Sequence, residues 1–393
     1  MMSKKSPQLR FEGFTDDWEE RKLKELFQPS KNKNNNGLYN QKDILAASLG
    51  TELIPKRTFF GLKSTRESVK NYRIVKTGDL IYTKSPIKGF PNGIIRSNKG
   101  NVGIVPPLYC VYTLQKDINS SIIQLYFEDK NRLDFYLFPL VNVGARNNVN
   151  ITDLEFLEGK VTIPKSYEEQ SKIVQFMEQL NTTIALHQRK LDLLKEQKKG
   201  YLQKMFPKNG AKVPELRFAG FADDWEERKS KELCTISTGK GNTQDKVDDG
   251  AYPFYVRSAK IEKSDEYLYD QEAVLTVGDG VGTGKVYHYV NGKYNLHQRV
   301  YRMYDFKDVS AKYFYYYFSK NFYKRVISMT AKTSVDSVRM EMIADMNIVF
   351  PSLKEQENIV ELFSNLDNTI VLHQRKLDLL KEQKKGFLQK MFV

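Results

Sequence analysis

The stretch of this chain that comes closest to a known chemical motif is the glycine-rich sequence GDGVGTGK at 278–285. A loop of this kind can cradle the phosphates of a nucleotide when its glycines and its lysine have the right spacing. The spacing fails the P-loop pattern, because Asp279 stands at the first required glycine and Val286 follows the lysine. It also fails the dinucleotide-binding pattern, because Thr283 stands at the third glycine and the next residues are typical of a strand. We therefore predict a glycine-rich hairpin loop and no nucleotide site.

Other residues with catalytic potential lack the partners that chemistry requires. Asp153, Glu158 and Lys160 have a nuclease-like order, but such sets arise by chance in a chain with 28% charged residues. No Asn or Asp precedes a Pro-Pro pair, as a methyltransferase would need. The two cysteines, Cys110 and Cys234, match neither a zinc-ligand spacing nor a disulfide framework. We predict no catalytic residue, no metal site and no cofactor on this chain.

The charge of the chain indicates an anionic partner. The 393 residues include 62 Lys and Arg against 48 Asp and Glu, a formal net charge of +14. This balance favours nucleic acid over a membrane surface. No apolar run approaches the roughly 18 residues of a membrane span, and the first residues lack the apolar core of a secretion signal. We expect a soluble, cytoplasmic protein with no membrane partner.

Basic and amide side chains gather in segments of loop-like composition. Arg and Lys can bind guanine edges, Asn and Gln can bind adenine edges, and all four also bind phosphates. The plainer alternative for each segment is an ordinary solvated loop. The candidate DNA-binding residues in the first half are Lys31, Lys33, Arg57, Lys84, Lys88, Arg96, Arg146, Asn147 and Asn148. Those in the second half are Lys240, Asn242, Arg257, Lys285, His297, Gln298, Arg299, Lys332, Ser334 and Arg339.

The sequence contains two copies of one plan. Residues 9–27 and 216–234 share fifteen of nineteen residues, and residues 183–206 and 369–392 share twenty-two of twenty-four. The intervening stretches, about 28–163 and 235–350, hardly match. Both nevertheless end in a pattern that predicts a loop, a short helix and an edge strand. We expect one fold with two different surfaces, in which the identical parts do one job twice.

The long repeats predict two coiled-coil helices. Apolar residues alternate at spacings of four and three, which is a heptad pattern. Each helix covers about 50 Å between its outer seam positions, at 1.5 Å per residue. Because a globular domain joins the two helices, we expect them to pair antiparallel about a pseudo-two-fold axis. The seam residues singled out as scaffold or docking positions are Leu180, Ile184, Leu191 and Leu194, with Leu366, Ile370, Leu377 and Leu380.

Each half opens with the same segment, GF-x-DDWEERK, which combines one tryptophan with a helix-like run from acidic to basic residues. Trp18 and Trp225 are the candidate anchors. Two interpretations stay open: the tryptophans tie each segment onto its own domain, or the duplicated surface docks a partner subunit. The basic run KEQKKG, at 195–200 and 381–386, is open to the same choice between a solvated helical face and a docking site.

Taken together, these motifs resemble the specificity subunit of a type I restriction–modification enzyme. GF-x-DDWE opens each half, EQ-x-x-I begins each long helix, and LDLLKEQKKG-[YF]-LQKMF closes it. The resemblance implies an α+β fold, with two target-recognition α/β domains of the same fold separated by two long antiparallel coiled-coil helices. It also implies a non-catalytic chain that directs adenine-N6 methylation and ATP-dependent cleavage by partner subunits to a bipartite asymmetric DNA site.

The resemblance also implies partners and boundaries. The expected partners are double-stranded DNA, two methyltransferase subunits, and restriction/translocase subunits bound through them. S-adenosylmethionine, ATP and Mg²⁺ are expected on those subunits and not on this chain. The boundaries are an opening conserved segment at 1–27, a first recognition domain at 28–163, a central helix at 164–208, a repeat of the opening segment at 209–234, a second recognition domain at 235–350, and a closing helix at 351–393.

Three other classes of protein compete with this interpretation. A two-headed transcriptional regulator would share the basic, bipartite organisation, but would more usually carry a helix-turn-helix, which we do not recognise here. A self-contained restriction–methylation enzyme would need the missing methyltransferase motif and a nuclease site. RNA binding is compatible with the charge, although no RRM or KH signature occurs in the sequence.

Overall fold

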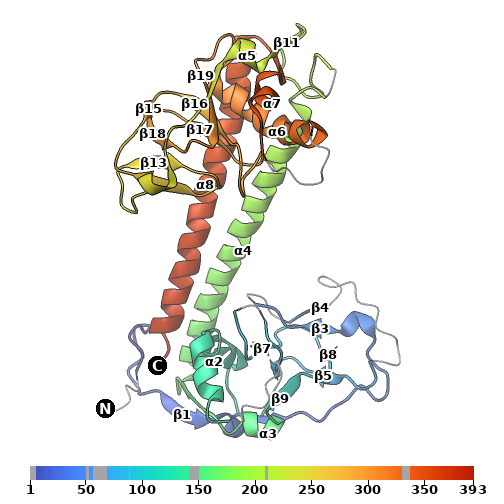
Figure 1. Ribbon diagram of the computed structural model, residues 1–393. Helices are drawn as coiled ribbons and strands as arrows, with labels where there is room; N and C mark the ends of the chain where they lie inside the picture. The colour runs from blue at the N-terminus through green and yellow to red at the C-terminus, as the bar shows by residue number, and fades with distance from the viewer. Residues whose placement is uncertain are drawn as a thin grey trace. The chain divides into compact units, whose positions relative to one another are not determined.

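The computed structural model describes residues 6–49, 53–55, 69–87, 89–140, 150–208, 211–329 and 337–393. The chain forms two compact units. Unit 1 comprises Met1–Gln188 with Arg375–Val393, and unit 2 comprises Arg189–Gln374. Each unit includes one half of each of two long helices, α4 (Tyr167–Lys204) and α8 (Leu353–Lys390), which Figure 1 shows in green and red.

Unit 1 is built on an antiparallel four-stranded sheet in the order β2-β9-β6-β7. Its strands are β2 (Phe27–Pro29), β9 (Cys110–Leu114), β6 (Leu80–Tyr82) and β7 (Ile95–Ser97). Two further antiparallel pairs are β5 (Arg73–Val75) with β8 (Gly103–Val105) and β3 (Leu45–Ala46) with β4 (Ile54–Pro55). The helices that follow the sheet are α1 (Ser120–Tyr126), α2 (Lys130–Leu137) and α3 (Asp153–Phe156). The 3-10 helix η2 (Gln41–Asp43) comes immediately before β3.

Unit 2 repeats this sheet in the order β12-β19-β16-β17, again antiparallel throughout. Its strands are β12 (Thr235–Thr238), β19 (Val300–Tyr304), β16 (Ala273–Val277) and β17 (Tyr287–Val290). A second sheet, β14-β13-β18-β15, consists of β14 (Ile261–Ser264), β13 (Tyr252–Tyr255), β18 (Lys293–Leu296) and β15 (Tyr269–Asp270). Unit 2 also contains the turn η4 (Thr243–Asp245) and the helices α6 (Ala311–Met329) and α7 (Met340–Ala344).

The two units have the same fold, as predicted. In each unit, the strand of the main sheet that comes first in the sequence pairs with the strand that comes last. The sheet is followed by helical sequence, then a short helix, then an edge strand. The units differ in that α6 is continuous, whereas α1 and α2 divide the corresponding stretch, and in that the second sheet of unit 2 has four strands, whereas unit 1 has two separate two-stranded pairs. The glycine-rich sequence 278–285 lies between the antiparallel strands β16 and β17, so the predicted hairpin loop is confirmed.

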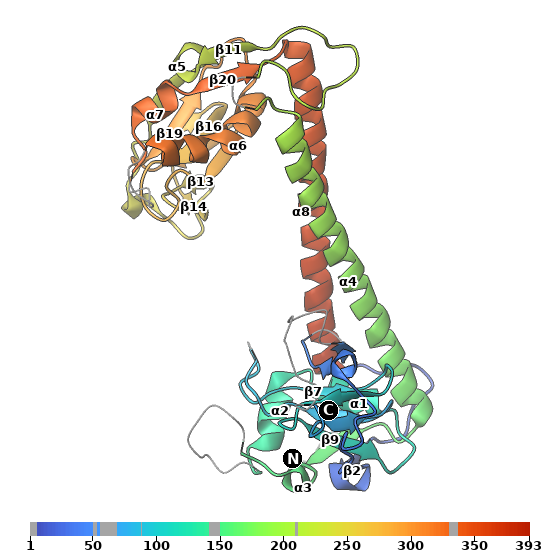
Figure 2. The same ribbon diagram turned by 90° about the vertical axis from the view of Figure 1, so that its right-hand side faces the viewer.

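The EERK segments are strands, so our helix-like prediction for them was wrong. β1 (Glu19–Lys22) pairs antiparallel with β10 (Lys160–Ile163). β11 (Glu226–Lys229) pairs in the same way with β20 (Asn347–Phe350), and Figure 2 shows these two strands side by side. A diagonal polar contact joins the strands of each ladder: Lys160 forms an ion pair with Glu20 at 2.7 Å, and the side-chain amide of Asn347 donates to Glu227 at 2.7 Å. The helical turn comes only afterwards, at η1 (Leu23–Glu25) and α5 (Ser230–Leu233).

The heptad seam and the antiparallel pairing are confirmed in each unit separately. In unit 1 the start of α4 lies beside the end of α8, where the rings of Phe176 and Phe387 are 4.9 Å apart. In unit 2 the end of α4 lies beside the start of α8, where Lys198 forms an ion pair with Asp367. Of the eight scaffold positions, Leu191, Leu194, Leu366, Leu377 and Leu380 are buried, and Leu180, Ile184 and Ile370 are half-buried.

The duplicated segments make duplicated contacts at the start of each long helix. Arg10 binds Glu169 with both nitrogens, at 2.6 and 2.8 Å, and Arg217 binds Glu355 in the same way, at 2.8 Å twice. Both carboxylates are 1% exposed. The next residue in each helix is a glutamine whose amide donates to a proline carbonyl and accepts from the backbone N–H of Asn119 or Ser310.

The leucine before each of these arginines binds the end of the other long helix. The backbone N–H of Leu9 donates to the carbonyl of Lys390, and that of Leu216 donates to the carbonyl of Lys204, at 2.9 and 2.8 Å. These carbonyls belong to the last turn, where no intrahelical partner is available. The opening segment thus joins the start of one long helix to the end of the other in both units.

The ion pairs at the helix starts predict unequal costs of disruption. Arg217→Met leaves Glu355 buried without a cationic partner, which should cost about 3–5 kcal/mol of unit 2 stability. Arg10→Met should cost less in unit 1, because the indole N–H of Trp18 still donates to Glu169, at 3.2 Å. Amide hydrogen exchange in β11 and β20, compared with β1 and β10, measures both effects. Equal increases in amide exchange in the two variants would contradict this explanation. Adding Glu355→Gln to Arg217→Met should partly restore the stability of unit 2.

The heptad seam predicts opposite effects for neighbouring leucines. Leu191 is 1% exposed and Leu193 is 61% exposed. Leu191→Asp buries a carboxylate in an apolar seam, so it should lower the melting temperature and the helical circular dichroism. Leu193→Asp adds the same charge to the solvent face and should leave both unchanged. A Leu191→Asp protein that melts with the parent would show the seam assignment to be wrong.

Candidate nucleic-acid interface

Four loops of unit 2 bring most of its predicted DNA-binding residues together. The loop after β12 carries Lys240 and Asn242, and the loop after β18 carries Gln298. The N–H of Gly241 donates to the carbonyl of Leu296, and the N–H of Gln298 donates back to the carbonyl of Gly241, both at 2.8 Å. The side chain of Gln298 also donates to Asn242 Oδ1 at 3.0 Å. These exposed polar groups therefore form one surface instead of two separate loops.

Two arginines of this surface meet at a carboxylate that sequence reasoning missed. Arg257, after β13, and Arg299, after β18, lie on either side of Asp279 in the glycine-rich hairpin loop. The loop is joined to the segment around Arg339 by a hydrogen bond of 2.7 Å from the N–H of Val338 to the carbonyl of Gly278. Arg339 itself is exposed at the start of α7 and lies 3.3 Å from Glu341.

Two other residues of unit 2 are placed differently. His297 is 5% exposed, and its Nδ1 accepts from the N–H of Arg299 at 3.1 Å. Burial, reinforced by the charges of Arg257 and Arg299, lowers its pKa, so the neutral ring supports the turn that carries Arg299. Its prediction as a DNA contact was wrong, because the ring is covered. Lys285 lies 5.0 Å from the centre of the Tyr323 ring, and its side chain is exposed.

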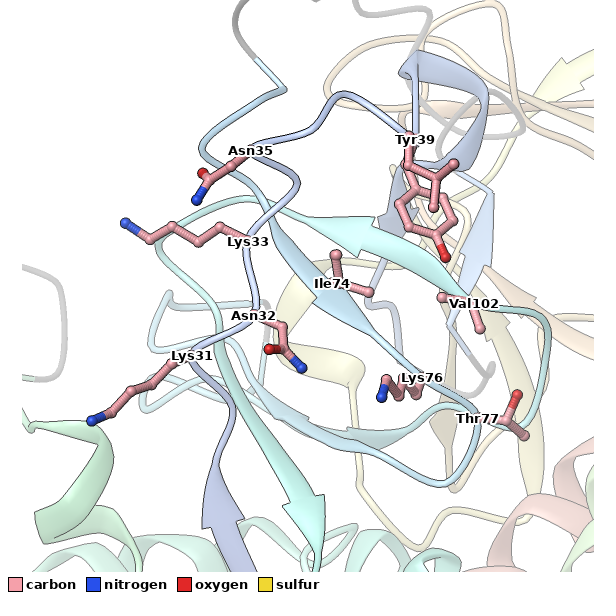
Figure 3. A pocket seen from close by; sticks show the side chains of 10 residues that line it. Lys31, Asn32, Lys33, Asn35, Tyr39, Ile74, Lys76, Thr77 and Val102 are labelled. Carbon is pink, nitrogen blue, oxygen red and sulfur yellow. The ribbon is translucent and has the colours of Figure 1, made fainter.

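In unit 1, Lys31 and Lys33 lie on the exposed segment after β2. Both residues line a surface hollow of about 660 Å³, whose wall Figure 3 shows with Asn35, Tyr39 and Lys76. They also line a neighbouring hollow of about 850 Å³, with Arg73, Asp153 and Leu154. The two lysines therefore stand between two concave areas of one basic surface.

Arg73 belongs to this surface and was missed, because it lies inside strand β5 and not in a loop-like segment. It forms an ion pair with Asp153, and Lys84 lies 3.8 Å from the same carboxyl group. Burial opposes ionisation of Asp153, but hydrogen bonds from Cys110 and Arg73 outweigh it and lower the pKa of the carboxyl group. Asp153 is thus a charge partner of two basic residues.

Arg96 is a correction to the predicted contacts. Its side chain is 3% exposed, and its guanidinium donates to the backbone carbonyls of Ser48 and Ile95, at 2.9 and 2.8 Å. Burial lowers its pKa. The arginine points inward from β7 and satisfies buried carbonyls, so it cannot reach DNA in this structure. Seven other candidates lie outside the described residues: Arg57, Lys88, Arg146, Asn147, Asn148, Lys332 and Ser334.

The tryptophans of the repeated segments are anchors of their own units. Trp18 and Trp225 are each 2% exposed. The ring of Trp18 makes an edge contact with Phe392, at 5.9 Å, and that of Trp225 makes one with Tyr313, at 6.2 Å. Of the two interpretations left open for them, the structure supports anchoring, because neither ring presents a surface to a partner. Among the described helices, none has the length and apolar character needed to cross a membrane.

Comparison with known proteins decides the family. Residues 15–196 and 222–382 both match the type I restriction modification DNA specificity domain. The chain belongs to this family. The domain thus occurs twice, once in each half of the sequence, in agreement with the repeated sheet and the repeated helix contacts.

Individual specificity subunits resemble the chain at low identity. The EcoDI specificity subunit of Escherichia coli is 26% identical over 166 residues, which are 42% of this chain and 36% of that protein. The chain thus spans about a third of that relative. The MjaVIII specificity subunit of Methanocaldococcus jannaschii is 22% identical over 308 residues, 69% of this chain and 72% of that protein.

Solved structures of the family share the fold. The crystal structure of the type I specificity subunit from M. genitalium superposes with a TM-score of 0.69 at 12% identity, covering 99% of both chains. A chain from a structure of type I restriction–modification complex assembly gives a TM-score of 0.50 at 13% identity, covering 95% of this chain and 97% of that one. The α+β class with two recognition domains of one fold is therefore established.

Proposed function

We propose that this chain recognises a bipartite, asymmetric DNA site and directs adenine-N6 methylation and ATP-dependent cleavage to it. The chain belongs to the type I specificity family, and each of its units carries one basic loop surface. The observation that carries the proposal is a contrast: the two units share their sheet order and helix contacts, while their surface loops differ in sequence and in side-chain arrangement. Two units with different DNA-binding surfaces on the same framework fit two different half-sites.

The proposed contacts follow from exposure and position. In unit 2 they are Lys240, Asn242, Arg257, Lys285, Gln298, Arg299 and Arg339, all exposed. In unit 1 they are Lys31, Lys33 and Arg73, with Lys84 at the edge of the same surface. Basic side chains can position the DNA through its phosphates, while arginine and amide groups can read base edges. The boundaries 28–163 and 235–350 serve as the proposed recognition domains.

The chemistry belongs to partner subunits in this proposal. The chain acts as a non-catalytic cytoplasmic subunit, while methyltransferase subunits hold S-adenosylmethionine and restriction/translocase subunits use ATP and Mg²⁺. Each long helix offers the methyltransferase an equivalent apolar patch at one exposed leucine. The leucines are Leu193 on α4 in unit 2, which is 61% exposed, and Leu379 on α8 in unit 1, which is 52% exposed. Equivalent patches favour two methyltransferase subunits per chain.

Exchange of one recognition domain tests the specificity proposal. Replacing residues 28–163 with the matching stretch of another family member should change one half of the methylated motif and keep the other half and the spacer. Replacing residues 235–350 is the matched control and should change the opposite half. N6-methyladenine mapping of DNA from cells that express the chain with its methyltransferase gives the motif directly. If one exchange alters both halves, the proposal is wrong, and an unchanged methylome with altered transcription would favour the two-headed regulator.

The duplicated leucines predict the stoichiometry. Native mass spectrometry with saturating methyltransferase should show two copies per chain. Leu193→Asp should reduce this to one copy, and the double variant Leu193→Asp/Leu379→Asp should abolish binding, because a charge replaces an apolar contact at each patch. Lys199→Asp introduces the same carboxylate on an already polar face of α4 and should retain both copies. A one-to-one complex for the parent chain would refute the proposed pair of sites.

A further inference from the structure

One carboxylate in unit 2 lies between two exposed arginines. Asp279 Oδ1 is 3.5 Å from Nη1 of Arg257, and Asp279 Oδ2 is 3.7 Å from Nε of Arg299. The three side chains come from three loops, after β13, β16 and β18, and are separated by about twenty residues of sequence on each side of the aspartate. The carboxylate therefore links loops that the sequence keeps apart.

Backbone hydrogen bonds fix this cluster in place. The N–H of Gly278 donates to the carbonyl of Arg299 at 2.9 Å, and the N–H of Gly282 donates to the carbonyl of Arg257 at 3.3 Å. A Cβ atom on Gly278 would come within 2.7 Å of the Arg299 carbonyl oxygen, so a side chain there would push the loops apart. Asp279 also forms a backbone bridge with Ser337. The loops thus meet before any ligand binds, and Asp279 stands at their junction.

The two guanidinium groups retain donors for a ligand. The side chains of Arg257 and Arg299 are 50% and 65% exposed, whereas that of Asp279 is 28% exposed. At 3.5 and 3.7 Å the carboxylate attracts both arginines without a short hydrogen bond to either. An arginine has five N–H donors, so each can still make a bidentate contact. The carboxylate restricts the long side chains and leaves their ends accessible.

The composition of the cluster favours a base edge over a phosphate. Asp279 offsets one of the two positive charges and would itself repel a phosphate group. A base edge has no net charge: arginine can bind guanine O6 and N7 together, and a carboxylate can accept from cytosine N4. Val281, two residues further along the loop, is 95% exposed. A valine at that tip gains nothing from a phosphate, while the methyl group of thymine would give it an apolar contact.

We propose that Asp279 is a positioning residue that determines specificity, because it holds Arg257 and Arg299 as a preformed pair directed at the base edges of one half-site. This inference rests on the proposed function, in which unit 2 reads that half-site. It assigns base reading to the Arg257–Asp279–Arg299 cluster and leaves phosphate contacts to the surrounding basic residues, such as Lys240.

Asp279→Asn tests the proposal in the full chain bound to its methyltransferase. The variant keeps the shape of the side chain but releases both arginines, so discrimination should fall about tenfold or more at one or two positions of a single half-site. Its affinity for unrelated DNA should not fall, because a negative charge has been removed, and the salt dependence of binding should be at least as steep. Arg257→Lys and Arg299→Lys keep the charge, lose the bidentate contact, and should relax positions in the same half-site.

Asp248→Asn is the matched control. Asp248 is an exposed aspartate of unit 2 whose side chain is 88% exposed, so its replacement makes the same charge change away from the cluster. It should leave every position of the motif unchanged. The test uses DNA duplexes that differ from the parent motif at one base pair. The methylation rate and the binding affinity, measured for each duplex across salt concentrations, give all the required comparisons.

Several outcomes would overturn the proposal. Discrimination unchanged in Asp279→Asn would show that the carboxylate is not a positioning residue. Binding to all duplexes weakened by the same factor in Arg257→Lys and Arg299→Lys, with the discrimination between duplexes unchanged, would assign the cluster to phosphates. If Asp279→Asn lowers the melting temperature, the two lysine variants still decide, and unchanged discrimination in both would reject base reading by the pair. A parent complex that methylates no bipartite motif would reject the proposed function and this inference together.

Discussion

The buried carboxylate at the start of each long helix constrains the rest of its unit. Glu169 and Glu355 lie in the first turn of α4 and α8, where the helix dipole favours a negative charge. That preference is far too small to compensate for complete burial, so each glutamate needs a cation with matching geometry. Arg10 and Arg217 supply it from the repeated opening segments, with two nitrogens on two oxygens. The long helices can therefore begin inside a core only where that segment is already in place.

This requirement explains why an opening segment and a long helix are repeated together. The opening segment binds the first turn of one helix through its arginine and the last turn of the other through a backbone N–H. Its tryptophan fills the adjoining core, and its EERK strand completes a ladder with the edge strand that leads into the helix. Both units share the arginine, backbone and strand contacts, whereas the indole hydrogen bond to the glutamate is present only at Trp18 among the described residues. A substitution in one copy would break several contacts at once, whereas the surface loops have no such role.

Much of the framework could be predicted from the sequence, because its signals are local or repeated. The heptad positions predicted the buried seam of α4 and α8, and the two long repeats predicted two units with one fold. The EERK strands could not be predicted in the same way. Their four charged residues have no apolar alternation, and they form strands only because Lys160–Ile163 and Asn347–Phe350 pair with them from more than a hundred residues away.

The candidate site shows the same division between local and distant signals. Exposed basic residues such as Arg257 and Arg299 could be found from composition, because a charged side chain in a loop is normally solvated. Arg96 has the same composition around it but points into unit 1, where two backbone carbonyls need a donor. His297 is likewise covered by a neighbouring loop. Asp279 attracted attention only as a departure from a nucleotide-binding motif, because its partners are neighbours in space and not in sequence.

The difference between the two units lies in how each uses its acidic residues. In unit 1, Asp153 is held by Arg73 at the wall of a hollow, and a hydrogen bond from the buried thiol of Cys110 lowers its pKa further. In unit 2, Asp279 lies in a glycine-rich loop between two arginines that remain half-exposed. An acidic residue inside a basic surface weakens general attraction to phosphates, and in our proposal its role is to order the basic groups around it. Since the two units order different groups with different geometry, the same framework can present two unlike sets of donors. Under the proposed function, these different loops distinguish the two halves of an asymmetric site, while the equivalent helix contacts hold both units to one framework.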